Sequence, residues 1–230
     1  DYYQSTLIPA LLLAQDDRDR GVLTAEQEQR LAGVAMTVVQ DLAAGIEAET
    51  ADAGGDADDA LPGVGLSIGV VGGRSAIDDV AAVVLAQALQ IEGATARANP
   101  HGDLSPQRFA ALQTTETDCL LLCFLDPSPT RASLLHLRRI KRAAPALRVG
   151  VVILAMPESL EKGADEMRSV AAVAAEKLAE AEDLGADFVA TTLDAAMEAA
   201  WQRNPAKPVP AAPKPKPRSR KRLPVNSGLA

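Results

Sequence analysis

From residue 66 onward, short apolar runs alternate with stretches of helical periodicity, and this alternation constrains the fold more than any other feature of the sequence. Uninterrupted apolar runs are typical of strands buried on both faces, and strands separated by helices are typical of a parallel sheet. We expect strands over residues 66–73, 94–98, 119–125, 148–155 and 186–190. The prediction is an α/β fold with a flavodoxin-like, doubly wound, five-stranded parallel sheet in the order 2-1-3-4-5.

A helical pattern follows each expected strand. The first helix is predicted from apolar residues at three- and four-residue spacing, namely Val80, Val83, Val84, Ala88 and Ile91. The second is predicted from Ser105-Pro106, because proline is favoured at the first position of a helix. In all, helices are expected over residues 74–92, 105–113, 131–144, 162–184 and 193–203.

Residues 1–49 precede the sheet and are expected to form a helical hairpin. One helix is predicted from Tyr2 to Asp19, and a second, starting at a Thr24 to Gln27 capping box, runs to about Glu47. The apolar stripe of the second helix is expected to contain Leu31, Val34, Ala35, Val38, Val39, Leu42 and Ile46. This stripe has to be covered either by the sheet domain or by a partner chain, so a homo-oligomer formed through these helices is one expectation.

Two further segments differ in composition from the sheet domain, which is expected over residues 65–203. Residues 50–64 are acidic and rich in Gly and Ala, which indicates a flexible linker, because the aspartates lack the spacing of a calcium loop. Residues 204–230 are rich in Pro, Lys and Arg and are predicted to be a disordered tail. The tail is expected either to contact acidic lipid, nucleic acid or an acidic protein surface without sequence specificity, or to remain solvated without a dedicated partner.

Charge and cysteine content exclude some classes of protein. Seven of the 23 basic residues and none of the 31 acidic ones lie in residues 205–230, so the folded body is acidic. This is not the footprint of a specific nucleic-acid-binding domain. Cys119 and Cys123 should point to the same face of one strand and stay reduced, as expected of a cytoplasmic chain. No run of residues reaches the length and apolarity of a membrane span.

Ligands of this topology bind beyond the carboxyl ends of the first and third strands, so the candidate site lies there. Its expected ligand-binding residues are Gly72, Gly73, Arg74, Ser75, Asp126, Ser128 and Thr130. One interpretation is that the glycine-rich turn holds an anion on backbone N–H groups at a helix start. The other is that the glycines and Ser75 shape and cap an ordinary turn. The pattern is neither G-x-G-x-x-G nor a Walker loop, so it does not indicate a nucleotide.

The sequence offers no convincing catalytic or metal-binding set. His101 and His136 are the only histidines, and they fall in a turn and on a helix with several bases. Asp126 follows the third strand, as the phosphorylated Asp of receiver domains does, but the acidic pair expected after the first strand is absent. We therefore expect a protein that is not an enzyme, with no cofactor and no metal. The basic run from Arg138 to Arg142 is expected to be either a solvated helix face or a patch for acidic groups.

The first 21 residues resemble a known family. They follow the pattern YYxxxLIPALxLAxxDRxRG, which resembles the segment after the transmembrane part in large members of the autoinducer-2 exporter family of predicted permeases. In those proteins a sheet domain similar to cobalamin-binding domains comes next, and residues 66–92 resemble it at the level of the fold. The resemblance implies spanning helices upstream of Asp1 and a location at the cytoplasmic face of the inner membrane.

The resemblance to cobalamin-binding domains does not extend to their ligand. Those domains place an Asp-x-His-x-x-Gly motif after the first strand, where this chain has Gly72-Gly73-Arg74-Ser75 and no histidine. Cobalamin coordination through that histidine is therefore not expected. The predicted function is a non-enzymatic, cytoplasmic regulatory or assembly domain of such a permease. The alternative is a sensor that binds a small ligand, cobalamin-like or an anionic metabolite, in the crevice between the first and third strands.

Overall fold

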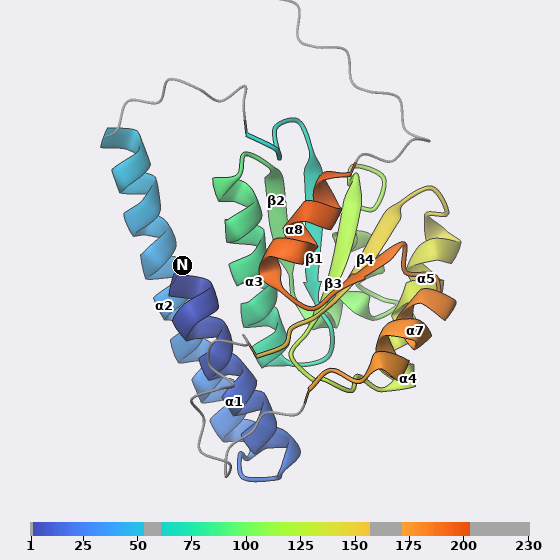
Figure 1. The fold of residues 1–230 in the computed structure, drawn as a ribbon, viewed down its shortest axis with the longest axis horizontal. Helices are drawn as coiled ribbons and strands as arrows, with labels where there is room; N and C mark the ends of the chain where they lie inside the picture. Colours follow the sequence, from blue (N-terminus) through green and yellow to red (C-terminus); the bar gives the residue numbers. More distant parts are fainter. Residues whose placement is uncertain (1, 53–60, 157–171, 203–230) are drawn as a thin grey trace, which may run out of the picture.

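Five parallel strands form the centre of the molecule. The computed structural model describes residues 2–52, 61–156 and 172–202, and places the strands in the order β2-β1-β3-β4-β5 (Figure 1). The strands are β1 (Ser67–Gly72), β2 (Thr95–Asn99), β3 (Cys119–Phe124), β4 (Arg148–Ile153) and β5 (Phe188–Ala190). This confirms the predicted flavodoxin-like α/β fold. The winding reverses between β1 and β3, which pair directly with each other.

Each central strand contributes to two hydrophobic cores because successive side chains point to opposite faces of the sheet. In β3, for example, Leu121 and Cys123 join one core, while Leu122 and Phe124 join the other. Helices cover both faces, so every residue of β3 is buried. The apolar runs of the sequence reflect this burial on both sides.

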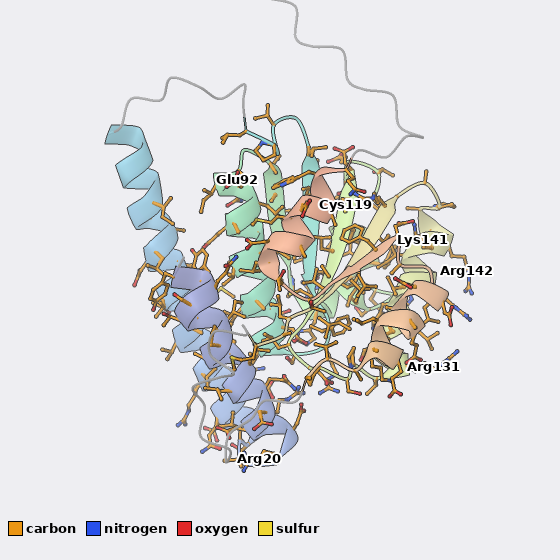
Figure 2. All side chains as sticks on the ribbon, viewed as in Figure 1. Arg20, Glu92, Cys119, Arg131, Lys141 and Arg142 are labelled. Atoms are coloured by element: carbon orange, nitrogen blue, oxygen red, sulfur yellow. The ribbon has the colours of Figure 1, made fainter. Side chains whose placement is uncertain are left out.

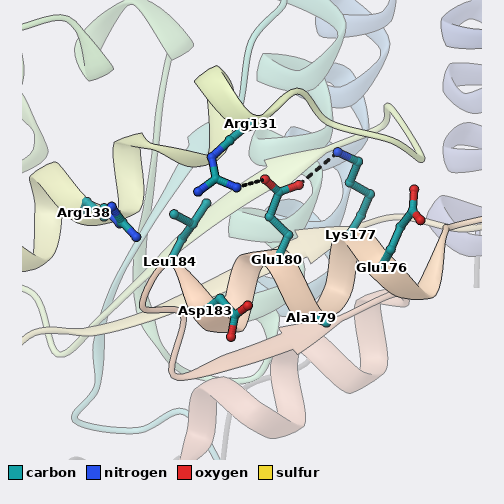
Figure 3. A pocket seen from close by; sticks show the side chains of 8 residues that line it. All are labelled: Arg131, Arg138, Glu176, Lys177, Ala179, Glu180, Asp183 and Leu184. Carbon is teal, nitrogen blue, oxygen red and sulfur yellow. Dashed lines mark hydrogen bonds and ion pairs between the residues drawn. The ribbon is translucent and has the colours of Figure 1, made fainter.

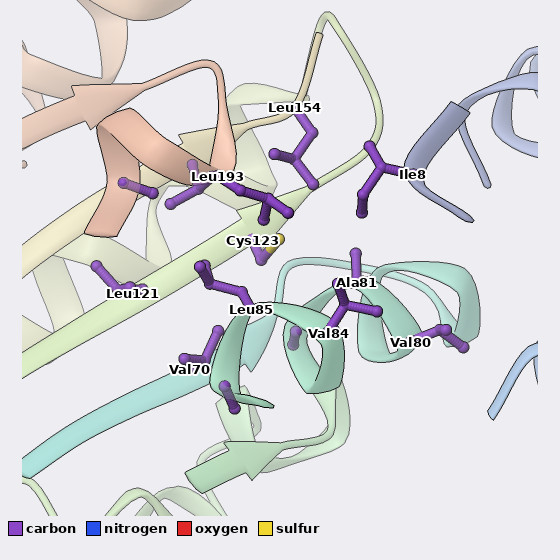
Figure 4. Close-up of a cluster of buried hydrophobic side chains, with 14 of the residues drawn as sticks. Ile8, Val70, Val80, Ala81, Val84, Leu85, Leu121, Cys123, Leu154 and Leu193 are labelled. Carbon is purple, nitrogen blue, oxygen red and sulfur yellow. The ribbon is translucent and has the colours of Figure 1, made fainter. Parts of the chain in front are cut away.

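The first face of the sheet carries two layers of helices. The helices of this face are α3 (Ala76–Ile91) and α8 (Leu193–Trp201), and the hairpin consists of η1 (Tyr3–Leu7, a π-helix), α1 (Ile8–Asp19) and α2 (Ala25–Asp52). The hairpin lies against the outer side of α3 (Figure 1). Figure 4 shows Ile8 of α1 near Ala81 of α3 in the same cluster as Cys123. The sheet domain therefore covers α1 and part of the apolar stripe of α2.

Packing on both of its sides changes the expected apolar pattern of α3. The stripe from Val80 to Ile91 was predicted to face one way, but Ala82, Leu85 and Leu89 are also fully or nearly fully buried, and Ile91 at the end of the helix is 48% exposed. A helix that is buried nearly all round is expected where it lies between two layers. A similar correction applies to α2, where Val34 is 67% exposed and Ala32 is buried instead.

Polar contacts fix the hairpin in place. The Tyr3 hydroxyl donates to the Gln87 side chain of α3, and Gln87 Nε2 donates to the Val39 carbonyl of α2 at 3.4 Å. The predicted capping box of α2 is confirmed, since Gln27 N donates to Thr24 Oγ1 at 3.3 Å and Thr24 N donates to Gln27 Oε1 at 2.8 Å. Helix α2 continues through Asp52, farther than expected, and residues 53–60 of the predicted linker lie outside the described residues.

The second face is covered by shorter elements: η3 (His101–Leu104), η4 (Phe109–Leu112), α4 (Arg131–Leu134), α5 (His136–Ala143) and α7 (Ala175–Asp183). The prediction of one helix over 105–113 is wrong. The carbonyls of Leu112 and Gln113 accept from the Arg97 guanidinium of β2, and Gln113 adopts a left-handed φ of 46°, so no regular helix continues there.

The remaining helices also differ from their predicted bounds. The helix expected over 131–144 is divided at Leu135 into α4 and α5. Helix α7 begins only at Ala175, and residues 157–171, which hold part of the helix expected over 162–184, lie outside the described residues, as does the tail from 204 to 230. Among the described helices, none combines the length and the apolarity needed to cross a bilayer.

Candidate functional site

The turn after β1 is shaped by its packing against neighbouring side chains. A Cβ added at Gly73 would lie 2.1 Å from the ring of Phe124, and one added at Gly72 would lie 2.1 Å from the carboxylate of Asp79. Gly73 N donates to the Cys123 carbonyl at 2.8 Å, which holds the turn against β3. The two glycines are therefore required by close approach of the chain's own groups.

The backbone donors of this turn are occupied by an internal carboxylate. Asp78 Oδ2 accepts from the backbone N–H groups of Arg74 at 2.9 Å and Ser75 at 3.1 Å, and Oδ1 accepts from Leu125 N at 2.8 Å. Ser75 caps α3 by accepting from Asp78 N at 3.2 Å. These N–H groups were the predicted anion holders, and in the structure Asp78 is the anion that they hold.

Burial makes Asp78 an unusual carboxylate. Only 1% of the residue is exposed, and desolvation raises its pKa to about 6, although the hydrogen bonds to Leu125, Arg74 and Ser75 favour the charged form. Asp78 ties the start of α3 to the end of β3, across the point where the winding reverses. A ligand anion at this edge of the sheet therefore has to be bound by side chains instead of by the turn.

Arg74 and Asp126 are the two predicted site residues that the structure brings together. Arg74 Nη1 lies 3.4 Å from Asp126 Oδ2, and Nη2 lies 3.7 Å from Asp19 Oδ1 of the hairpin. Both distances exceed the ~2.7–2.9 Å of a charge-assisted hydrogen bond, so the guanidinium retains donors for another partner. The Asp126 carboxylate also accepts from Ser128 N at 2.8 Å, and Thr130 caps α4, so both of these residues stabilise their own loop.

A pocket of about 390 Å³ lies beside this ion pair, and we call it the switch-point pocket. It is lined by Gly73, Arg74, His101, Gly102, Leu104, Ser105, Ala132, Ser133 and His136. Both histidines of the chain therefore meet at one site, although the sequence placed them on separate elements. The signal available for His101 was its position just after β2, because the carboxyl ends of parallel strands lie at one edge of the sheet.

The two imidazoles differ in their surroundings. Asp79 accepts two hydrogen bonds from His101, one from the backbone N–H at 2.6 Å and one from Nδ1 at 2.8 Å. Because an ionised carboxylate can only accept, we assign the ring proton to Nδ1, which leaves Nε2 as an acceptor. Burial and the nearby Arg139 charge lower the pKa of His136, which favours the neutral form of its ring.

A second hollow of about 560 Å³ lies between α4, α5 and α7 (Figure 3). Its charges are balanced internally, because Glu180 pairs with Arg131 at 3.1 Å and Lys177 at 2.9 Å, and these partners lower the Glu180 pKa. The basic run of α5 is also partly engaged, since Lys141 binds Asp187 while Arg142 extends outward (Figure 2). The switch-point pocket is therefore the stronger candidate site.

The other reactive groups do not form a site. Cys119 and Cys123 are both free and buried on the same face, as predicted, and burial raises the pKa of the Cys119 thiol to about 12. Within the part of the chain that the structure describes, no three His, Cys, Asp or Glu side chains are grouped to hold a metal ion.

Comparisons of the chain with protein-family models, curated proteins and solved structures found no match.

Proposed function

We propose that this chain is a non-enzymatic regulatory module that binds a small anionic ligand in the switch-point pocket and transmits binding to its helical hairpin. One observation carries the proposal: Arg74 lines the pocket, and its guanidinium also pairs with Asp19 at the end of α1. The same side chain thus faces the ligand space and the hairpin.

The two partners of Arg74 are held with different strength. The Asp126 side chain is 12% exposed and also bound to its own loop, whereas the Asp19 side chain is 42% exposed and 3.7 Å away. Exposed ion pairs are typically worth ~1 kcal/mol or less. A ligand carboxylate or phosphate therefore replaces Asp19 more easily than Asp126, and the end of α1 is released when Arg74 turns to the ligand.

Two observations support a binding role over catalysis. The backbone N–H groups of Arg74 and Ser75 donate to Asp78. They are therefore not free to stabilise a negative charge that develops on a substrate during a reaction. The cysteine thiols are buried in the core, and the Cys119 pKa is far above neutrality.

The size of the pocket bears on the class of ligand. A corrin with its nucleotide arm is much larger than a pocket of about 390 Å³, so the cobalamin-like form of the sensor is disfavoured.

We also propose that the module is a cytoplasmic appendage of a permease of the autoinducer-2 exporter type. The resemblance of the first 21 residues supports this part. Those residues form η1 and α1, so the segment that would follow the spanning helices ends at Asp19, next to the pocket. The test is the coding sequence upstream of Asp1, which should encode several spanning helices. A reading frame that starts with Met near Asp1 would contradict the permease part alone.

The ligand part is tested by thermal unfolding of the full chain with acetate, succinate, alanine, the other amino acids and inorganic phosphate as probes. A probe present at a hundred times its Kd stabilises the native state by ~2.7 kcal/mol, which raises the Tm by several degrees. Arg74→Ala should abolish this shift. Arg30→Ala is the matched control, because it removes an arginine whose side chain is 76% exposed on α2. If no probe gives an Arg74-dependent shift, the sensor proposal is wrong.

A further inference from the structure

The charges around the switch-point pocket are unusual for an anion site. Among the described residues that line the pocket, Arg74 is the one arginine or lysine, and it already faces Asp126 and Asp19. A third carboxylate, Asp79, lies directly behind His101. A phosphate dianion brought to this guanidinium would therefore meet repulsion from three acids, which the single Arg139 charge near His136 offsets only in part. The surroundings favour a ligand whose own negative charge is balanced by a positive one.

His101 supplies the complementary contact. Its Nδ1–H is donated to Asp79, and Nε2 has no hydrogen-bond partner among the described residues. The Asp79 carboxylate fixes the tautomer in which Nδ1 carries the proton, so Nε2 is free to accept from a ligand donor. Burial lowers the pKa of His136, the other imidazole of the pocket, and so disfavours a competing positive charge there.

We infer that the switch-point pocket recognises a small zwitterion, with the ligand's carboxylate on Arg74 and its ammonium group on His101 Nε2, which is the chemistry of a free α-amino acid. This inference rests on the proposed function, since it names the ligand class of the same site. A volume of about 390 Å³ is near the lower end of the ~300–1,000 Å³ of ligand pockets, which suits a molecule of this size. The remaining lining includes Leu104 and Ala132, which can contact an apolar side chain.

The inference is tested by titration calorimetry on the full chain with matched ligand pairs. Each of the common amino acids is compared with its 2-hydroxy analogue, as alanine is with lactate, and ethylamine and inorganic phosphate complete the set. At least one amino acid should bind at least about tenfold more tightly than its hydroxy analogue, because both groups can donate to Nε2 but only the ammonium makes a charge-assisted hydrogen bond there. His101→Gln should remove most of this preference while Arg74-dependent acetate binding changes less than about twofold.

Folding of each variant is checked by its Tm without ligand. If His101→Gln unfolds the chain, Asp79→Asn is used, which removes the carboxylate that holds the proton on Nδ1 and should reduce the amino-acid preference in the same direction. Equal binding of amino and hydroxy acids, or tightest binding of phosphate, would overturn the inference while leaving an Arg74-dependent anion site. Absence of Arg74-dependent binding for every probe would remove the sensor proposal as well.

Discussion

Helix α3 is held on its two sides by different kinds of contact. Toward the sheet, Asp78 in its first turn accepts from three backbone donors, and Gly73 in the turn before it lies against the buried ring of Phe124. Toward the hairpin, apolar side chains such as Leu11 and Val39 are buried, but the polar contacts of α3 and its preceding turn are partly exposed, from Tyr3 to Gln87 and from Arg74 to Asp19. The polar contacts on the sheet side are therefore sealed, whereas those on the hairpin side can be replaced by another partner.

The largest effect is expected where the sheet side is tightest. Gly73→Ala places a methyl group against the Phe124 ring, and neither the turn nor the buried ring has space to move. We expect a loss of about 3 kcal/mol in the free energy of unfolding, at the upper end of overpacking effects. Urea unfolding followed by circular dichroism measures it.

Gly33→Ala is the matched control on the hairpin side. Nothing lies within 4 Å of a Cβ added at Gly33, which is exposed on α2. Because alanine favours helix over glycine by up to ~1 kcal/mol, this variant should be as stable as the wild type or more stable. If the two alanine variants lose equal stability, the loss in Gly73→Ala does not come from overpacking against Phe124.

The next effect concerns the pH dependence of Asp78. Its folded pKa of about 6 is above the ~3.9 of an unfolded aspartate, so the native state binds more protons than the unfolded state between these values. Stability contributed by this residue is therefore present at pH 4 and is lost as pH rises toward 6.5. The free energy of unfolding of the wild type relative to Asp78→Asn should fall by roughly 2–3 kcal/mol across that window.

Urea unfolding of both proteins at pH 4.0, 5.0, 6.0 and 7.0 tests this sign. The comparison with Asp78→Asn removes the titration of the other carboxylates, which both proteins share. A difference that stays constant with pH would show that Asp78 keeps an ordinary pKa. A difference that grows in favour of the wild type would show that its three hydrogen bonds outweigh its burial.

The sheet could be predicted from the sequence because its strands are short apolar runs whose identity does not depend on distant residues. The expected strand over 119–125, for instance, corresponds to Cys119–Phe124. The prediction of a helix over 105–113 was wrong for the opposite reason. Arg97 belongs to another element, β2, and donates to the carbonyls of Leu112 and Gln113 at the end of this segment, which no local pattern reveals. Local patterns predict local structure, and tertiary hydrogen bonds override them.

The site shows the same division. Topology alone placed Arg74 opposite Asp126, and the structure pairs them at 3.4 Å. The meeting of His101 and His136 depends on how η3 and α5 pack, and the sequence does not contain that information in a local form. Ser75 and Asp78 have the spacing of a helix cap, but the bond from Leu125 N to Asp78 joins residues 47 positions apart. The sequence therefore predicted the edge of the sheet at which the pocket lies, but not most of the residues that line the pocket.

A smaller effect is expected from Tyr3→Phe on the hairpin side. The variant loses the hydrogen bond from the Tyr3 hydroxyl to Gln87 and keeps the ring, so it should cost about 1 kcal/mol. Hydrogen exchange followed by mass spectrometry should show faster exchange in η1 and α1, with the strands unchanged. Equal acceleration in β1 and β3 would mean that the hairpin and the sheet unfold as one unit.

The smallest change in stability, and the one that bears most directly on signalling, is expected from Asp19→Asn. The Asp19 side chain is 42% exposed, so losing its ion pair with Arg74 should cost less than about 0.5 kcal/mol. In Asp19→Asn the ligand no longer has to displace this carboxylate, so an Arg74-dependent probe should bind a few-fold more tightly. Amide hydrogen exchange at the end of α1 should be equally fast with and without the probe. In the wild type, exchange there should accelerate only when the probe is added. If the probe accelerates α1 exchange equally in both proteins, Arg74 does not connect the pocket to the hairpin.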